Sequence, residues 1–413
     1  MPLQLGAQVV VHQPDSSGGG RCRAFTGLPA TTPAWIRIDA ATPADRLSAQ
    51  RLGGEIVALL GRLNPGMREI RPPCSGWNYG DCHARSTPDC VKILLPVFTA
   101  KSSYKIPAAW RTKDVTFRVA PVLTSGTDPS VLSAALRKLN AVRWSPGDPT
   151  GLFDLLRLAR IISDRRRVFI SYVRADSDPL AEQLFDALGK RGFDVFMDRF
   201  RLDPGVDFQV RLLEELSRIG SVLVLESPGI LKSRWVRHEI DFARKYQLGR
   251  MALALAGGSP KVPGIPAASR VQFGPGDLTG KAGKLRALPL RQIVARLEAL
   301  HARAEQVRIA YLRDNLSRAL AMDGFLQQGF DPGGTVLARK SAMHAFRVCN
   351  LPAELGDFQA IDAHRAWAST SHVVAPARFM DWRSRASLDW LAARAGIQMD
   401  DHAEMPAVLK GLA

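Results

Sequence analysis

The chain has 413 residues, of which 46% are hydrophobic and 23% charged. This is the composition of a globular protein and it excludes a mainly disordered chain. The formal net charge is +17, spread over the first two thirds of the chain with Arg165-Arg166-Arg167 as the only dense run. Nucleic-acid binders usually gather their basic residues into one stripe or patch, so we expect no nucleic-acid partner. Because no stretch approaches 18 consecutive apolar residues and the N-terminus lacks a secretory pattern, we predict a cytoplasmic protein without membrane contact.

The length predicts two to four domains, and the element pattern favours three. The first, residues 1–163, combines strands and helices in alternation, which is typical of an α/β domain with a parallel sheet. Its predicted strands are 7–12, 34–39, 91–98 and 115–123, and its predicted helices are 45–63, 129–139 and 151–162.

The second predicted domain, residues 164–303, shows the clearest alternation. We expect strands at 168–172, 193–197, 222–225, 251–255 and 270–273, and helices at 178–191, 208–218, 233–246 and 286–303. This order predicts a flavodoxin-like, doubly wound parallel sheet.

The third region, residues 304–413, is predicted to be mainly helical. Helical periodicity is found at 305–328, 339–349 and 384–396, and no segment reads convincingly as a strand. We expect Trp367, Trp382 and Trp390 to belong to its core rather than to a functional site.

The five cysteines are an odd number, which argues against a disulfide framework. Cys74, Cys82 and Cys90 are evenly spaced and His83 is adjacent, so a zinc site is one interpretation. Structural zinc sites normally use short Cys-x2–4-Cys spacings, which are absent, so reduced loop cysteines are the favoured interpretation and we predict no metal.

Polar residues collect in the loops after the predicted strands of the middle domain. In an open parallel sheet, ligands bind at the carboxyl ends of the strands. Arginines match phosphate oxygens, a carboxylate accepts hydrogen bonds from ribose hydroxyls, and an aromatic ring stacks on a base. The set therefore favours a phosphorylated ligand that contains ribose. The loops that carry it are residues 171–177, 198–205, 226–229 and 233–239.

Five short motifs in this region occur in a fixed order over residues 168–275. They are Phe169-Ile170-Ser171-Tyr172, Gly192-Phe193-x-Val195-Phe196-x-Asp198, Leu202-x-x-Gly205-x-x-Phe208, Val222-Leu223-Val224-Leu225-x-Ser227-Pro228 and Ser233-x-Trp235-x-x-x-Glu239. Together they resemble the Toll/interleukin-1 receptor (TIR) domain family, and in particular bacterial TIR proteins that cleave NAD.

This resemblance implies one of two activities. Some TIR domains cleave NAD at the nicotinamide–ribose bond and need a glutamate at the position of Glu239, whereas others are scaffolds that only bind TIR domains. The catalytic alternative implies that Glu239 is the catalytic residue and that Tyr172, Arg174, Phe200, Arg201, Ser227 and Trp235 contact the substrate. It also implies NAD as substrate rather than cofactor, self-association, and a role in bacterial antiphage defence. A nucleoside deoxyribosyltransferase-like enzyme, which would act on nucleosides and ignore NAD, is a third interpretation.

The first domain resembles a degenerate copy of the same fold. Residues 93–99, Ser103, Trp110 and the strand that ends at 121–123 echo the third strand, the following helix start and the fourth strand of the middle domain. There is no room for a full helix between Trp110 and Val115, so we expect this domain to serve assembly rather than catalysis.

Overall fold

The computed structural model divides the chain into two compact units. One holds Met1–Asp164 with the short stretch Gly329–Gly334, and the other holds Arg165–Gln328 with Thr335–Ala413. The structure describes residues 8–15, 19–28, 33–72, 90–110, 117–197, 215–255, 259–279, 283–330, 335–377, 380 and 382–412. Among these residues, no helix is long and apolar enough to span a membrane.

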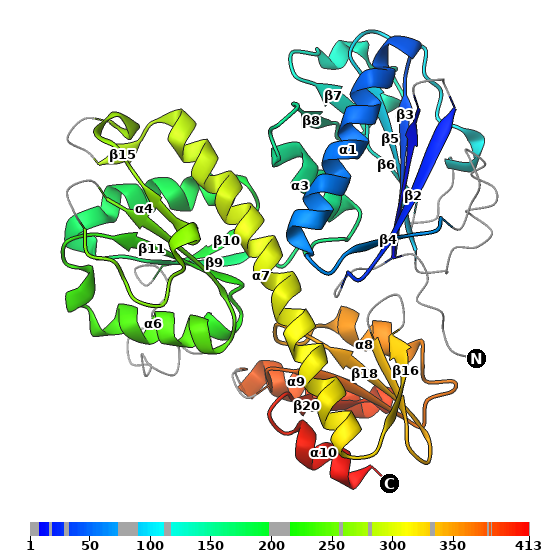
Figure 1. Cartoon of the computed structure of the whole chain (residues 1–413), viewed down its shortest axis with the longest axis vertical. Helices are drawn as coiled ribbons and strands as arrows, with labels where there is room; N and C mark the ends of the chain where they lie inside the picture. Colours follow the sequence, from blue (N-terminus) through cyan, green and yellow to red (C-terminus); the bar gives the residue numbers. More distant parts are fainter. Residues whose placement is uncertain are drawn as a thin grey trace. The chain divides into compact units, whose positions relative to one another are not determined.

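The first unit is built on an eight-stranded mixed sheet (Figure 1). Its order is β4-β2-β1-β3-β5-β7-β8, with β6 also paired to β5. Strands β1, β3, β5, β7 and β8 run parallel, whereas β2 is antiparallel to both β1 and β4. The strands are β1 (Val9–Pro14), β2 (Gly20–Thr26), β3 (Ala34–Ala40), β4 (Arg68–Ile70), β5 (Val91–Phe98), β6 (Phe117–Val119), β7 (Val122–Thr124) and β8 (Val142–Trp144). Helices α1 (Arg46–Leu63) and α3 (Thr150–Leu158) complete the α/β unit.

Two predictions for this unit were wrong in detail. The helix predicted at 129–139 consists of two short 3-10 turns, Pro129–Val131 and Leu136–Lys138, because Leu132 is extended and ends the first turn. The strand predicted at 115–123 is split into β6 and β7 by Ala120-Pro121, where proline offers no N–H to continue a ladder. Strands β2, β4 and β8 were not predicted.

The residues of the predicted alternative zinc site lie partly within the described structure. Cys90 is buried and free, whereas Cys74, Cys82 and His83 lie outside the described residues. Within the described part of the chain, no three His, Cys, Asp or Glu side chains are grouped so that they could hold a metal ion.

The middle of the chain forms a five-stranded parallel sheet in the order β10-β9-β11-β12-β13. The strands are β9 (Arg167–Ser171), β10 (Asp194–Phe196), β11 (Ser221–Glu226), β12 (Gly249–Ala254) and β13 (Arg270–Gln272). This confirms the predicted flavodoxin-like order. Helices α4 (Arg174–Lys190) and α6 (Arg234–Lys245) cover opposite faces of the sheet (Figure 1). Of the helix predicted at 208–218, residues 208–214 lie outside the described residues.

Side chains along β9 point alternately to the two faces of the sheet, one covered by α4 and the other by α6. Val168 and Ile170 pack with the apolar side of α4, while Phe169 packs with Ile240 and Ala243 of α6. Helix α4 has a non-helical residue at Ser177, and its regular part begins beside Pro179, a residue that suits the first turn of a helix. The helix predicted from 178 is therefore present, preceded by one additional turn.

The two sheets share one topological feature and differ in another. In both, the first strand lies between the second and the third. However, β2 runs antiparallel to β1 after a short connection, whereas β10 is parallel to β9 and follows the crossover helix α4. Parallel pairing requires such a crossover and antiparallel pairing requires only a turn, so the first sheet is mixed where the second is fully parallel.

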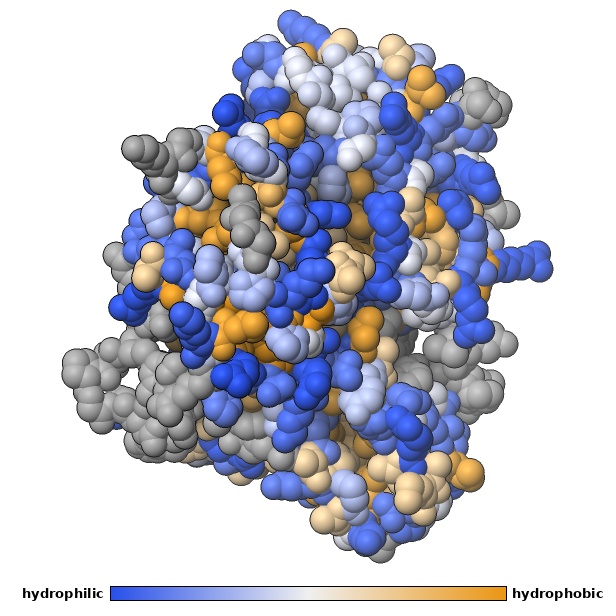
Figure 2. Space-filling model, turned by 60° about the vertical axis from the view of Figure 1, so that its left-hand side comes forward, coloured by the Kyte–Doolittle hydropathy of each residue, from blue (hydrophilic) through white to orange (hydrophobic). Residues whose placement is uncertain are grey.

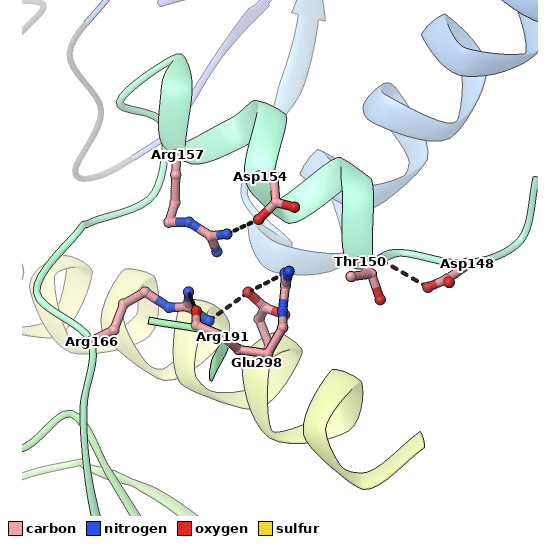
Figure 3. A network of polar contacts seen from close by, with 7 residues as sticks. All are labelled: Asp148, Thr150, Asp154, Arg157, Arg166, Arg191 and Glu298. Carbon is pink, nitrogen blue, oxygen red and sulfur yellow. Dashed lines mark hydrogen bonds and ion pairs between the residues drawn. The ribbon is translucent and has the colours of Figure 1, made fainter. Parts of the chain in front are cut away.

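Helix α7 (Ala287–Met322) is a single helix of 36 residues. The two helices predicted at 286–303 and 305–328 are therefore continuous, and residue 303 lies inside one element. The second prediction was too long, because the helix ends at Met322 and residues 326–328 belong to strand β16 (Leu326–Phe330). No glycine or proline after Pro289 interrupts it. Its buried Glu298 accepts hydrogen bonds from Arg166 and Arg191 (Figure 3). Arg166 also lies over the ring of Phe193, with 3.9 Å from its guanidinium carbon to the ring centroid.

Beyond α7 the chain forms a further five-stranded sheet, in the order β16-β17-β18-β19-β20. Its strands are β16 (Leu326–Phe330), β17 (Thr335–Arg339), β18 (Met343–Val348), β19 (Thr370–Ala375) and β20 (Gln398–Asp401), with helices α8 (Leu355–Asp362), α9 (Trp382–Ala395) and α10 (Met405–Gly411). The region holds more helical than strand residues, as predicted, but the expectation that it lacks strands was wrong.

The helix predicted at 339–349 is wrong for a physical reason. Its residues form the end of β17 and all of β18, where His344 and Arg347 interrupt the apolar alternation that identifies a strand. The prediction that the tryptophans are core residues was also wrong for two of them, since Trp367 is 47% and Trp390 62% exposed. The side chain of Trp382 lies outside the described positions. On the molecular face drawn in Figure 2, hydrophobic residues lie in small groups among hydrophilic ones.

Candidate functional site

The candidate site lies at the carboxyl edge of the middle sheet. Strands β9 and β11 are parallel neighbours, with Ser171 paired to Val224, so their carboxyl ends meet at this edge. Three chain segments follow: the turn from β9 into α4, the turn after β11, and helix α6. Ligands of open parallel sheets bind at this edge.

Glu239 is placed by helix α6. Ser233 caps this helix, since its side chain accepts a hydrogen bond from the backbone N–H of Val236. Glu239 is only 5% exposed, and its Oε2 accepts a hydrogen bond of 2.5 Å from the hydroxyl of Ser171, itself 2% exposed. A buried carboxylate is costly unless it is hydrogen-bonded, so Ser171 at the end of β9 holds Glu239 in a defined orientation.

A second carboxylate joins the two loops of this edge. Oδ2 of Asp176, in the first turn of α4, accepts hydrogen bonds from the hydroxyl of Ser227 at 2.7 Å and from the backbone N–H of Gly229 at 2.9 Å. These hydrogen bonds hold the pKa of Asp176 below its usual value. Sequence reasoning did not single out Asp176 or Ser171, although both lie within or beside the first motif.

The residues predicted to contact substrate lie as follows. Tyr172 is half-buried and its hydroxyl hydrogen-bonds Asp178 at 3.1 Å, Arg174 is exposed at the first position of α4, and Ser227 is buried and directed to Asp176. The backbone of Trp235 lies in the first turn of α6, one turn before Glu239, but its side chain is not described. Phe200 and Arg201 lie outside the described residues. Of these residues and their neighbours, Ser171 bonds Glu239 directly and Ser227 bonds Asp176, while Tyr172 bonds Asp178.

Glu226, the last residue of β11, is held by hydrogen bonds inside the domain. It is fully buried, and its Oε1 accepts hydrogen bonds from the backbone N–H of Val262 at 2.7 Å and from Nε of Arg270 at 3.2 Å. Arg270 in turn donates to the carbonyl of Ile265 at 2.6 Å. Glu226 therefore fastens the segment before β13 to the centre of the sheet.

A pocket of about 460 Å³ lies on another part of this domain, between β13 and α7. Its walls include Phe273, Asp277, Ile293 and Arg296 but none of the residues around Glu239. The buried, hydrogen-bonded carboxylate is therefore the stronger candidate, because a reaction needs a reacting group and this pocket offers no comparable one.

Comparison with known proteins agrees with the geometry. Residues 168–279 match the family model described as TIR domain. The chain is 32% identical over 73 residues to a protein named 2' cyclic ADP-D-ribose synthase BtTIR, from Bacteroides thetaiotaomicron. This match covers 18% of the chain and spans about a quarter (25%) of the length of that relative.

Solved structures give weaker likenesses. The TIR domains of the activated Roq1 resistosome, which recognises the effector XopQ, share 23% identity over 22% of this chain and 57% of that chain, with a TM-score of 0.21. Proximal thread matrix protein 1 from the mussel byssus shares 12% identity over 66% of this chain and 96% of that chain, with a TM-score of 0.20.

The strand order, the carboxyl-edge position of Glu239 and the family match at residues 168–279 coincide. Residues 168–279 of this chain form a TIR domain.

Proposed function

We propose that this TIR domain cleaves NAD at the nicotinamide–ribose bond, with Glu239 as the catalytic carboxylate. The observation that carries the proposal is that Glu239 is buried at the carboxyl edge of the sheet with Oε2 held by Ser171. A glutamate on the solvent-facing side of a helix would be exposed, and no hydrogen bond would hold its side chain in one orientation.

The chemistry needs only one carboxylate. Breaking a glycosidic bond develops positive charge on the ribosyl ring, as in other glycoside cleavages. A fixed carboxylate beside the ring stabilises that charge and accepts hydrogen bonds from the ribose hydroxyls. The nicotinamide ring of NAD is already positively charged and leaves as a neutral base, so no general acid has to protonate it. The hydroxyl of Ser171 keeps Glu239 oriented for this task.

The remaining site residues have defined parts in the proposal. Arg174 is exposed on the rim and suits a phosphate oxygen of the substrate, while Tyr172 suits the sugar or base. Phe200, Arg201 and Trp235 complete the substrate contacts in this proposal. The predicted contact of Ser227 with the substrate is not part of it, because Ser227 is completely buried and its hydroxyl donates to Asp176. No cofactor or metal takes part, and NAD is the substrate.

The acceptor of the ribosyl group decides the product. Water gives ADP-ribose, and a hydroxyl of the ADP-ribose itself gives a cyclic product. The match to a protein named 2' cyclic ADP-D-ribose synthase supports the cyclic outcome as one of the two. In the cell, we propose that the protein works in the bacterial cytoplasm, in antiphage defence signalling, and that TIR domains of several copies associate to form the active state.

The test measures free nicotinamide from NAD with the purified full chain, with and without a crowding agent, and separates ADP-ribose from cyclic products by chromatography. The variant is Glu239→Gln, and the control is Asp241→Asn, an exposed residue on the same helix. Turnover by wild type and D241N but not by E239Q supports the proposal. Self-association without turnover in any of the three would refute it and favour the non-catalytic scaffold. Turnover of nucleosides but not NAD would favour the deoxyribosyltransferase-like alternative.

A further inference from the structure

The carboxylate of Asp176 connects the two loops that border the candidate site. It follows β9 by five residues, and it accepts hydrogen bonds from Ser227 and from the backbone of Gly229, both in the turn after β11. Residues 176, 227 and 229, which we call the loop clamp, thus join segments about fifty residues apart in sequence. A carboxylate that accepts two such bonds is a stronger anchor than a neutral acceptor.

The turn is shaped to receive this carboxylate. A Cβ atom at Gly229 would lie 2.8 Å from Oδ2 of Asp176, so a larger residue at this position would push the carboxylate away from its two donors. Ser227 is completely buried. The lowered pKa of Asp176 follows from the hydrogen bonds to Ser227 and Gly229, so the clamp is ionised and intact at neutral pH.

The clamped turn leads directly to the catalytic helix. Gly229 is followed by the 3-10 turn Ile230–Lys232, whose Ile230 is completely buried, and then by Ser233, the cap of α6. The start of α6 is therefore set by the position of the turn at Gly229. Glu239 lies less than two helical turns after this start, so a shift of the turn moves its carboxylate.

Two residues from the end of β9 and the start of α4 act on Glu239. Ser171, the last residue of β9, bonds its carboxylate directly, and Asp176 fixes the turn that precedes its helix. If the turn moved while Ser171 stayed, the 2.5 Å bond between Ser171 and Glu239 could not be kept in the same geometry.

We propose that Asp176 is a positioning residue for NAD cleavage, which acts through the loop clamp to hold α6 and Glu239 in register with β9. This inference rests on the proposed function. Asp176 itself does not touch the reacting atoms. Its loss lowers the rate of the chemical step rather than the affinity for NAD, because the phosphate and base contacts are made by other residues.

The test compares Asp176→Ala, Asp176→Asn and the control Asp186→Ala, an exposed aspartate on the same helix. We expect D176A to lower kcat roughly 10- to 100-fold with KM changed less than about threefold, since misplacement of a catalytic group by about 1 Å costs up to that much. D176N retains a neutral acceptor of the same shape and should recover part of kcat. D186A should match wild type.

A double-variant cycle with Ser227→Ala distinguishes the clamp from two independent effects. If the two residues act as a unit, D176A/S227A loses no more kcat than D176A alone. Hydrogen exchange of the backbone at 227–240 should accelerate in D176A and not in D186A, at equal secondary-structure content. If D176A does not fold, the same measurements on D176N decide the question.

The outcomes separate this inference from the proposed function. Active wild type with D176A and D176N indistinguishable from D186A would overturn the positioning role and leave NAD cleavage intact. If kcat of D176A/S227A fell by the product of the two single-variant losses, the two residues would act independently and the clamp would be overturned. Wild type that releases no nicotinamide, like E239Q, would refute the proposed function, and the positioning role would fall with it.

Discussion

Replacing Glu298 by glutamine tests the buried ion-pair network that fastens α7 to the TIR domain. The Glu298 side chain is 2% exposed, and its Oε1 accepts a 2.5 Å hydrogen bond from Arg166, which is 5% exposed. Arg191 contributes a second guanidinium, with 3.2 Å from its Nη2 to Oε2 of Glu298. In Figure 3 both arginines point toward the carboxylate. The Glu298→Gln change keeps the shape of the side chain and removes its charge.

The expected cost follows from burial. Removing one partner of a buried ion pair costs about 3–5 kcal/mol, because the remaining charge stays buried without compensation. Arg166 retains the carbonyl of Arg191 and the ring of Phe193 as partners, and glutamine still offers one acceptor oxygen. The remaining partners of Arg166 and the acceptor oxygen of glutamine both reduce the loss. We therefore expect E298Q to lower the free energy of unfolding by about 2–3 kcal/mol.

Urea unfolding followed by circular dichroism measures this change. The control is Asp241→Asn, which breaks an exposed pair between Asp241 and Arg244, with both side chains more than 60% exposed (68% and 66%). Exposed pairs contribute little, so the control should change stability by less than about 0.5 kcal/mol. A cost for E298Q no larger than that of D241N would refute the reasoning, since it would show that the network contributes nothing beyond an exposed pair.

Two further predictions concern Glu239 and the pH dependence of stability. Ser171→Ala removes the hydroxyl that bonds Oε2 of Glu239. The kcat for NAD should then fall by about tenfold, which corresponds to the loss of one hydrogen bond to a charged group. An unchanged kcat would show that Ser171 does not orient Glu239. Burial, with Arg166 nearby, lowers the pKa of His301 from 6.5 to about 4, so the folded state disfavours its charged form. The neutral form of His301 therefore contributes fully to the free energy of unfolding above pH 6.5. This contribution is lost as the pH falls toward 4, by at most about 3 kcal/mol. Urea midpoints at pH 7.5 and 4.5 measure this loss. His301→Gln, which cannot titrate, should show a smaller difference between the two midpoints than wild type. An equal difference would assign the acid sensitivity to other groups.

Much of the middle domain could be predicted from local pattern. Its strands are short apolar runs separated by amphipathic helices, and burial on both faces of a parallel sheet produces such runs. The position of Glu239 was also accessible, because a helix beginning at residue 233 was predicted and a residue six positions after its start has a fixed place along the helix.

Prediction failed where a strand is short or carries polar residues in its buried part. Strand β18 includes His344, which is 3% exposed and bonds Thr370 of the neighbouring strand, and this pairing is invisible in sequence. Short strands such as β4 and β8 have three residues each, too few to show a period of two.

The sequence by itself determined the order of elements in the TIR domain, the family it belongs to and the residue types that gather at one edge of its sheet, because these depend on periodicity and spacing along the chain. Only the tertiary structure decided that Glu239 is buried against Ser171, that Asp176 joins Ser227 and Gly229, and that Glu226 fastens Arg270 rather than facing a ligand. These contacts join residues between 44 and 68 positions apart. Such partners are chosen by the pairing of strands and the packing of helices, which no local pattern contains.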